Sequence, residues 1–219
     1  MPWLPIAVLG RQRDFDAIMS VLRGHEGSVQ CVDRRGDSLV SGDDTGTTII
    51  SDANTGERIV HRKGHAGAVN SVAWNADGSK LASGSSDQTV MIWNPVSGEQ
   101  VSQLKGHTNW VRSVAWNADG SKLASGSDDS SVMIWNPVSG EQLSQLKGHT
   151  GRVWSVSWNA DGSKLASGSN DKTVMIWNAV SGEQLSQLKG RTTTAQRTLW
   201  FGSGSNEDHE PTSRSCLCC

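Results

Sequence analysis

The chain has little of several residue types that globular proteins use freely. Its 219 residues include no Tyr, two Phe, five Pro and four Cys, and only 35% of them are hydrophobic. No apolar run approaches the roughly 18 residues that a membrane-spanning helix needs, so we expect no membrane span. Helical bundles rarely combine so small an apolar fraction with 24 glycines, whereas short strands joined by turns do. The composition therefore favours an all-β protein.

Net charge and cysteine content argue against further classes of protein. Lys and Arg total 20 against 22 Asp and Glu, a net charge of −2, whereas dedicated nucleic-acid binders usually carry a basic excess. One cysteine stands alone and three lie together, which is not a disulfide framework; they are Cys31 and then Cys216, Cys218 and Cys219. Residues 1–10 are apolar but lack a basic leader and contain two prolines, so we expect no signal peptide. A cytoplasmic location is predicted, with the nucleus as the alternative.

Ten tryptophans stand out against this background, and the surrounding sequence repeats. The dipeptide Gly-His occurs at residues 24, 64, 106 and 148, and Gly190-Arg191 stands where a fifth pair would fall. The spacings of 40, 42, 42 and 42 residues are typical of solenoids and propellers. Within each period, short alternating apolar runs are separated by turn sequences, which predicts four strands, three turns and no helix.

A lone four-stranded sheet of this size cannot bury both faces, but sheets stacked around an axis can. The units read Gly-His, then Asp-Gly-Ser-Lys-Leu-Ala-Ser-Gly-Ser, then Asp-x-Thr-Val-x-Ile-Trp-Asn. This pattern resembles the WD40 family over residues 24–189, although Trp-Asn replaces the family's Trp-Asp. The resemblance implies an all-β fold, the WD40 β-propeller.

The expected division of the chain follows the repeat. Residues 24–63 form a degenerate first repeat, which keeps His25 and Ser41 but has Thr45 at the Asp position and Ser51 at the Trp position. Because a lost core Trp typically costs about 3–5 kcal/mol, we expect this blade to fold but to be the weakest. The second, third and fourth repeats are nearly identical and cover residues 64–105, 106–147 and 148–189.

The two ends of the chain leave the number of blades open. Within the N-terminal segment 1–23, residues 16–23 resemble the strand with which the family closes its ring, and residues 190–201 hold part of a fifth repeat. Residues 202–219 are expected to be a disordered tail. Four full blades plus fragments of a fifth fit an open arc, a small closed ring, or two chains in one larger ring. An open arc exposes strand edges and favours self-association.

A His, a Ser, an Asp and a Trp recur at fixed positions in each repeat. Ser, His and Asp are also the residues of a hydrolase triad, but a nucleophile is expected once, not three times at even spacing. The resemblance implies instead a buried hydrogen-bonded tetrad in each blade, in which every polar group has a partner. The predicted tetrads are His65, Ser83, Asp87 and Trp93; His107, Ser125, Asp129 and Trp135; and His149, Ser167, Asp171 and Trp177.

The three similar repeats differ in ten of their 42 columns. Most differences lie just after Gly-His or around the tetrad Asp, and the resemblance places both positions on one rim, the top face of the propeller. Loops on a rigid frame are where binding is usually placed, and Trp and Arg dominate interface hot spots; neutral drift at exposed loops is the alternative. The predicted protein-binding residues are Trp110, Arg112, Asp128, Arg152, Trp154 and Lys172.

These observations lead to one functional hypothesis and two alternatives. We expect a non-enzymatic scaffold that presents its top face to a peptide or protein partner within a larger complex, without a metal, cofactor or small-molecule substrate. A truncated propeller without independent function is one alternative. A nucleic-acid platform that uses Trp stacking and Arg contacts is the other, and the near-neutral charge disfavours it.

Two further features of the sequence are the similarity of its repeats to one another and its cysteine-rich end. The highly similar repeats also resemble the WD40 regions of fungal NACHT-type proteins, but the sequence contains no nucleotide-binding segment. The terminal Cys-Leu-Cys-Cys formally fits a prenylation pattern. No polybasic stretch precedes it, and one lipid without a second signal anchors a protein weakly. We interpret the tail as a chance sequence.

Overall fold

Antiparallel sheets make up the described part of the chain, which comprises residues 22–189 and 217–218 of a computed structural model. No helix occurs within these residues. The strands in chain order are β1 (Val29–Arg35), β2 (Ser38–Asp43), β3 (Thr47–Asp52), β4 (Arg58–Lys63), β5 (Val69–Trp74), β6 (Leu81–Ser85), β7 (Thr89–Trp93), β8 (Gln100–Lys105), β9 (Val111–Trp116), β10 (Leu123–Ser127), β11 (Ser131–Trp135), β12 (Gln142–Lys147), β13 (Val153–Trp158), β14 (Lys164–Ser169), β15 (Thr173–Asn178), β16 (Gln184–Lys189) and β17 (Leu217–Cys218).

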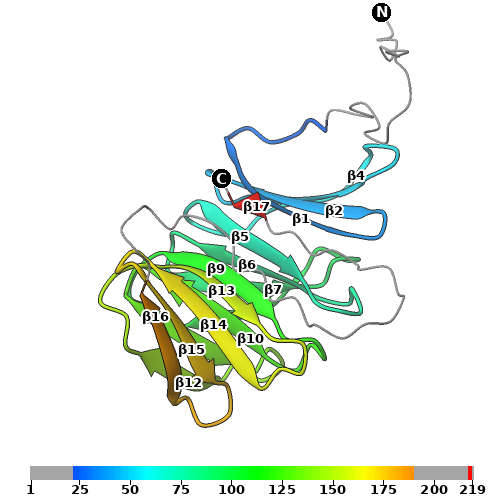
Figure 1. Ribbon diagram of the computed structural model, residues 1–219. Helices are drawn as coiled ribbons and strands as arrows, with labels where there is room; N and C mark the ends of the chain where they lie inside the picture. Colours follow the sequence, from blue (N-terminus) through cyan, green and yellow to red (C-terminus); the bar gives the residue numbers. More distant parts are fainter. Residues whose placement is uncertain (1–21, 190–216, 219) are drawn as a thin grey trace, which may run out of the picture.

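Four consecutive strands form each sheet, and we call the sheets blades 1 to 4 in chain order. Figure 1 follows them from blade 1 (blue to cyan) at the top of the view to blade 4 (yellow to brown) at the bottom. The short strand β17 pairs with β1 as a fifth strand of blade 1. The predicted all-β architecture with four blades is confirmed.

Burial along the strands explains why these sequences form blades. The second and third strands of blades 2 and 3 are buried throughout, since neighbouring blades cover both of their faces. The outer strands β8 and β12 bury a single leucine each, Leu104 and Leu146. Apolar runs inside and alternating polar residues outside are what a stack of sheets around an axis requires.

Neighbouring blades pack through glycine on one side and valine on the other. The inner strands touch in chain order, β1 with β5, β5 with β9 and β9 with β13. A Cβ atom at Gly84 would lie 2.7 Å from Val111 of the next blade, and one at Gly126 would lie 2.7 Å from Val153. Only glycine permits so close an approach, so these positions set the spacing of the blades.

The four blades form an arc, and no closed ring is formed by the described residues. The predicted closing strand at 16–23 lies outside the described residues except for its last two positions. The predicted partial repeat 190–201 and nearly all of the tail 202–219 also lie outside them. Among the described residues, no helix has the length and apolarity that crossing a membrane requires.

Candidate functional site

The predicted tetrad residues are joined by hydrogen bonds in blades 2, 3 and 4. In blade 2, His65 Nδ1 donates to Asp87 Oδ2 (2.8 Å), and the Ser83 hydroxyl donates to His65 Nε2 (2.7 Å). The Trp93 indole N–H donates to the same Ser83 oxygen (2.7 Å). The carboxylate can only accept, so Nδ1 carries the proton of this hydrogen bond. The corresponding distances in blades 3 and 4 are 2.7–2.8 Å.

Burial separates these networks from a catalytic triad. The order Asp–His–Ser matches that of a serine hydrolase, but all three serines, Ser83, Ser125 and Ser167, are fully buried. Each serine oxygen also accepts the indole N–H, so it has no free approach for a substrate carbonyl. Among the described residues, no group of three or more His, Cys, Asp or Glu side chains is arranged to hold a metal ion.

The tetrad aspartates stay ionised well into the acid range. Burial raises the pKa of Asp171, but hydrogen bonds from Thr173, His149 and the Thr150 backbone outweigh it and lower the pKa to about 2. The pKa values of Asp87 and Asp129 are also held well below the usual range, because hydrogen bonds from His65 and His107 outweigh burial. A buried carboxylate with this many donors is a fixed negative anchor.

These anchors hold the two variable segments of each repeat together. Asp129 Oδ2 accepts a hydrogen bond from the backbone N–H of Thr108, which opens the segment after Gly-His (3.0 Å). The backbone N–H of Asp128 donates to the carbonyl of Trp110 (2.9 Å). Blade 4 repeats both bonds. The two clusters of sequence differences therefore form one continuous strip of rim.

On the rim of blades 3 and 4, the variable residues gather around one guanidinium. Arg112 donates from Nε to Asp128 Oδ1 (2.8 Å) and from Nη2 to Asp128 Oδ2 (2.7 Å), a two-pronged ion pair. The same guanidinium carbon lies 4.7 Å from the ring centroid of Trp110 and 4.7 Å from that of Trp154. We call Trp110, Arg112, Asp128 and Trp154 the Trp–Arg–Trp cluster.

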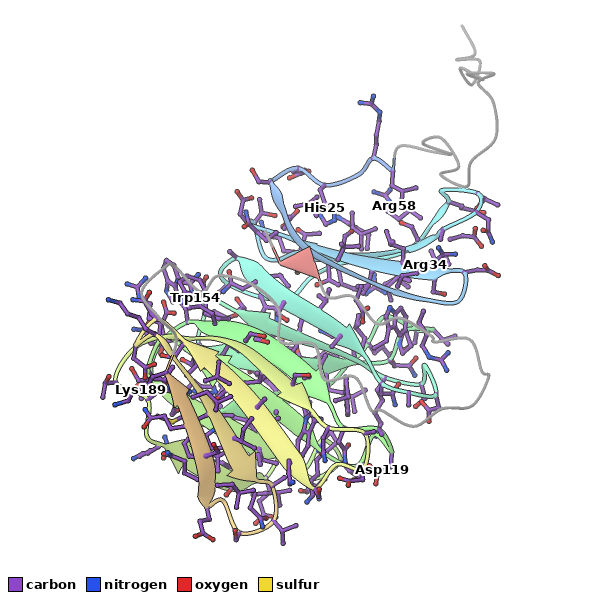
Figure 2. The ribbon with its side chains drawn as sticks, in the orientation of Figure 1. His25, Arg34, Arg58, Asp119, Trp154 and Lys189 are labelled. Carbon is purple, nitrogen blue, oxygen red and sulfur yellow. The ribbon has the colours of Figure 1, made fainter. Side chains whose placement is uncertain are left out.

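Exposure differs sharply within this cluster. Trp110 is 45% exposed and Trp154 is 39% exposed, whereas the side chains of Arg112 and Asp128 are largely covered. Arg152 reaches to 3.7 Å from Asp128 but remains mostly in solvent. Figure 2 shows Trp154 at the same end of the sheets as Lys189, opposite Asp119. The two indole rings of the cluster are thus exposed to solvent, whereas the ion pair between Arg112 and Asp128 is largely covered.

A comparison with protein families decides the identity of the fold. The sequence matches the family described as "WD domain, G-beta repeat" over residues 17–51, 56–94, 98–136 and 140–178. The chain belongs to the WD40 family. A search of curated proteins finds no match to it. WD40 repeats generally mediate protein–protein interaction, and the family is generally non-enzymatic.

The WD40 units in the sequence are offset from the blades by one strand. Each later match begins before an outer strand and ends at or just after the third strand of the next blade, as residues 98–136 do with β8 to β11. The first match begins at residue 17, inside the predicted closing strand. Strand β16 follows the last match, and it completes blade 4 from outside the matched ranges.

Blade 1 of this WD40 chain has a carboxylate beside its histidine, which the sequence comparison did not predict. Alignment gives it Thr45 in place of the tetrad aspartate, yet its histidine still donates to a carboxylate. His25 Nδ1 donates to Asp43 Oδ2 (2.7 Å), and the Ser41 hydroxyl donates to His25 Nε2 (2.7 Å). The carboxylate comes from two residues earlier, and Thr45 donates to it from both its backbone and its hydroxyl. Column-by-column comparison missed it, although Asp43-Asp44 was a visible signal.

The rim residues also vary as contacting pairs, which the sequence comparison did not reveal. Where blade 3 has Arg112 against Asp128, blade 2 has Asn70, which donates to Ser86 Oγ (3.1 Å). Both columns change together between repeats. Lys172, the remaining predicted rim residue, is exposed in the turn after Asp171. No hydrogen bond or ion pair among the described residues joins its side chain to the Trp–Arg–Trp cluster.

Proposed function

We propose that this WD40 chain is a non-enzymatic interaction module and that its contact surface is the rim of blades 3 and 4. The observation that carries the proposal is the pair of exposed indoles, Trp110 and Trp154, each with its ring centroid 4.7 Å from the guanidinium carbon of Arg112. Stacking and the ion pair with Asp128 fix the two rings before a partner arrives. Pre-ordered aromatic anchors lose little side-chain entropy on binding, which is how interface hot spots work.

Charge on the rim indicates the chemistry of the partner. Asp128 neutralises Arg112, whereas the cationic groups of Arg152 and Lys172 lie mostly in solvent. The rim therefore offers apolar ring surface bordered by positive charge. A peptide or protein segment that combines an apolar side chain with nearby carboxylates matches this surface. Such charge complementarity mainly raises the association rate and selects against cationic partners.

The test is a selection of random peptides on the immobilised full chain, followed by titration of the enriched peptides. We expect peptides with an aromatic or aliphatic residue beside Asp or Glu. Trp154→Ala and Trp110→Ala should each weaken binding about tenfold or more, since truncated hot-spot residues cost about 2 kcal/mol. Val138→Ala, which removes an exposed apolar side chain of blade 3 outside the Trp–Arg–Trp cluster, is the control and should leave binding unchanged.

Two results would contradict the proposal. Enriched peptides that bind Trp154→Ala and the unaltered chain equally would place the contact surface elsewhere. Equal losses in Val138→Ala and Trp154→Ala would show that binding does not depend on the Trp–Arg–Trp cluster. Arg152→Glu adds a test of the charge argument, because it should slow association of acidic peptides while leaving the indoles in place.

A further inference from the structure

The last face of blade 4 has the features of a surface built to be covered. A Cβ atom at Gly168 would meet no atom of residues 22–189 within 4 Å, whereas its equivalents Gly84 and Gly126 lie against valines of the next blade. Leu188 is 53% exposed, whereas its equivalents Leu104 and Leu146 are 1% and 2% exposed. Ser155 is exposed as well, although the matching serines in blades 2 and 3 are buried.

The first face of blade 1 has the complementary features. Val29 is 54% exposed, whereas the valines at the same column in blades 2, 3 and 4 are completely buried. Val32 is only half-buried, and its equivalents, such as Val114, are buried. In the interior of the arc, these two columns are the ones that pack on the glycine of the preceding blade. Blade 1 thus has valines with no glycine of a preceding blade to pack on, and blade 4 has a glycine with no valines of a following blade packed on it.

We infer that these two faces bind each other between two copies of this chain. Val29 and Val32 of one copy pack on Gly168 of the other, as Val111 and Val114 pack on Gly84 within one chain. The interior of the arc supplies the template three times, at Gly42, Gly84 and Gly126. The occupant is therefore a second copy, because the matching columns lie at the other end of the same chain.

The number of blades that a propeller can hold sets the size of the assembly. Each copy has one face of each kind, so two copies joined head to tail make two identical interfaces and leave neither face open. The product is a ring of eight blades, within the range of about four to eight that propellers span. A head-to-tail contact that closes gives such a ring, whereas one that does not close gives a filament. This inference is independent of the proposed rim function.

Leu22 of the same copy occupies part of the proposed interface. Leu104 and Leu146 pack beside turn glycines of the following blade, Gly140 and Gly182. At blade 1 the equivalent glycine is Gly56, and Leu22 lies 3.0 Å from its Cβ position. Leu188 of the second copy needs this place, so assembly displaces Leu22. Leu22→Ala should consequently tighten the dimer.

The test is the molar mass of the full chain by light scattering across a dilution series, with two face variants. We expect about twice the chain mass of 23.4 kDa for the unaltered protein. Val29→Asp and Gly168→Arg should each be monomers, because each variant spoils both interfaces of the ring. Val29 is exposed, and no atom of the described part of the chain lies within 4 Å of a Cβ at Gly168, so both variants should keep the unfolding transition of the parent monomer.

Mixing the two variants gives the sharpest result. An equimolar mixture should regain the dimer mass, since one of its two interfaces then carries both substitutions and the other is unaltered. Recovery also proves that each variant is folded. Gly126→Arg, at the same column inside the arc, is the matched control and should unfold the chain because Val153 fills its space. A monomeric parent, a dimer that survives in both variants, or an open series of larger species would overturn the inference.

Discussion

Blade 1 and blade 3 build the same hydrogen-bonded centre from different residues. In blade 3, His107 donates to Asp129, and the Trp135 indole completes the network through Ser125. In blade 1, the carboxylate comes from Asp43, and Ser51 stands where the indole would be. Arg58 lies against Gly24 there, where Trp135 and Gln142 lie against Gly106 in blade 3; Figure 2 labels Arg58 beside His25.

The comparison shows that a blade needs a carboxylate beside its histidine, and that the residue supplying it can stand at a different position of the repeat. A carboxylate under the histidine is kept in all four blades, although its column moves by two residues in blade 1. The indole is lost, and a flexible arginine stem covers part of the space. The polar requirement is strict because a buried imidazole N–H without an acceptor costs about 1–3 kcal/mol, whereas a hydrophobic side chain can be replaced by another of similar volume at a smaller cost.

The largest expected effect comes from removing the tetrad indole of blade 3, which has no counterpart in blade 1. Trp135 is almost completely buried and donates to Ser125, so Trp135→Ala should lower the free energy of unfolding by about 3–5 kcal/mol. Ser51→Ala, at the same column of blade 1, should cost less than about 1 kcal/mol. Urea denaturation followed by circular dichroism measures both. Equal losses would mean that blade 1 depends on this column as strongly as blade 3 does.

A second prediction tests whether Asp43 has taken over the tetrad role. Asp43 is fully buried and accepts hydrogen bonds from His25, Thr45 and Thr47. Asp43→Asn turns an amide group toward these donors and should cost about 2–3 kcal/mol, as Asp129→Asn should in blade 3. The neighbouring exposed Asp44 is the control. A larger loss for Asp44→Asn in urea denaturation would refute the assignment.

Acid should weaken all four blades through the same carboxylates. In the unfolded chain an Asp has a pKa of about 3.9, whereas hydrogen bonds overcome burial and hold the pKa of Asp171 at about 2. As the pH falls, these carboxylates therefore take up protons at a lower pH in the folded state than in the unfolded state. This stabilisation is complete above the unfolded pKa and is lost as the pH falls from about 4 to 2, at about 1 kcal/mol per carboxylate after screening.

The measurement for this prediction is the unfolding free energy as a function of pH. Asp171→Asn should lower stability near neutral pH and flatten the slope between about pH 4 and pH 2. Glu141→Gln removes one exposed acidic group and should leave the slope as it is. The pKa of Asp43 is also lowered, since bonds from Thr47, His25 and Thr45 outweigh burial. An unchanged slope in both Asp43→Asn and Asp171→Asn would contradict this account.

The repeat predicts the fold well because its signals are local. Gly-His, the Asn-Ala-Asp-Gly turns and the alternating strands recur at a fixed period, and each occurrence supports the next. Column-by-column comparison missed the bond between His25 and Asp43, since a side chain that reaches from a shifted column breaks the register on which the comparison relies. The stacking of Trp110 and Trp154 on Arg112 joins two blades, whereas repeat columns align equivalent positions of different blades and do not indicate which side chains touch between blades. The rim was therefore predicted as a set of residues, without its internal geometry.

The smallest expected effect concerns the turn after the tetrad aspartate. Blade 1 has Gly46 there with φ of 89°, whereas blade 2 has Gln88 with φ of 71°. A non-glycine residue in this left-handed region costs about 1 kcal/mol, and glycine partly offsets the relief through its larger unfolded-state entropy. Gln88→Gly should thus stabilise the chain by about 0.5 kcal/mol in urea denaturation. The reverse change, Gly46→Ala, should destabilise it, because a Cβ there would collide with the carbonyl of His65. A loss of stability in Gln88→Gly would show that the glutamine side chain contributes more than its backbone strain costs.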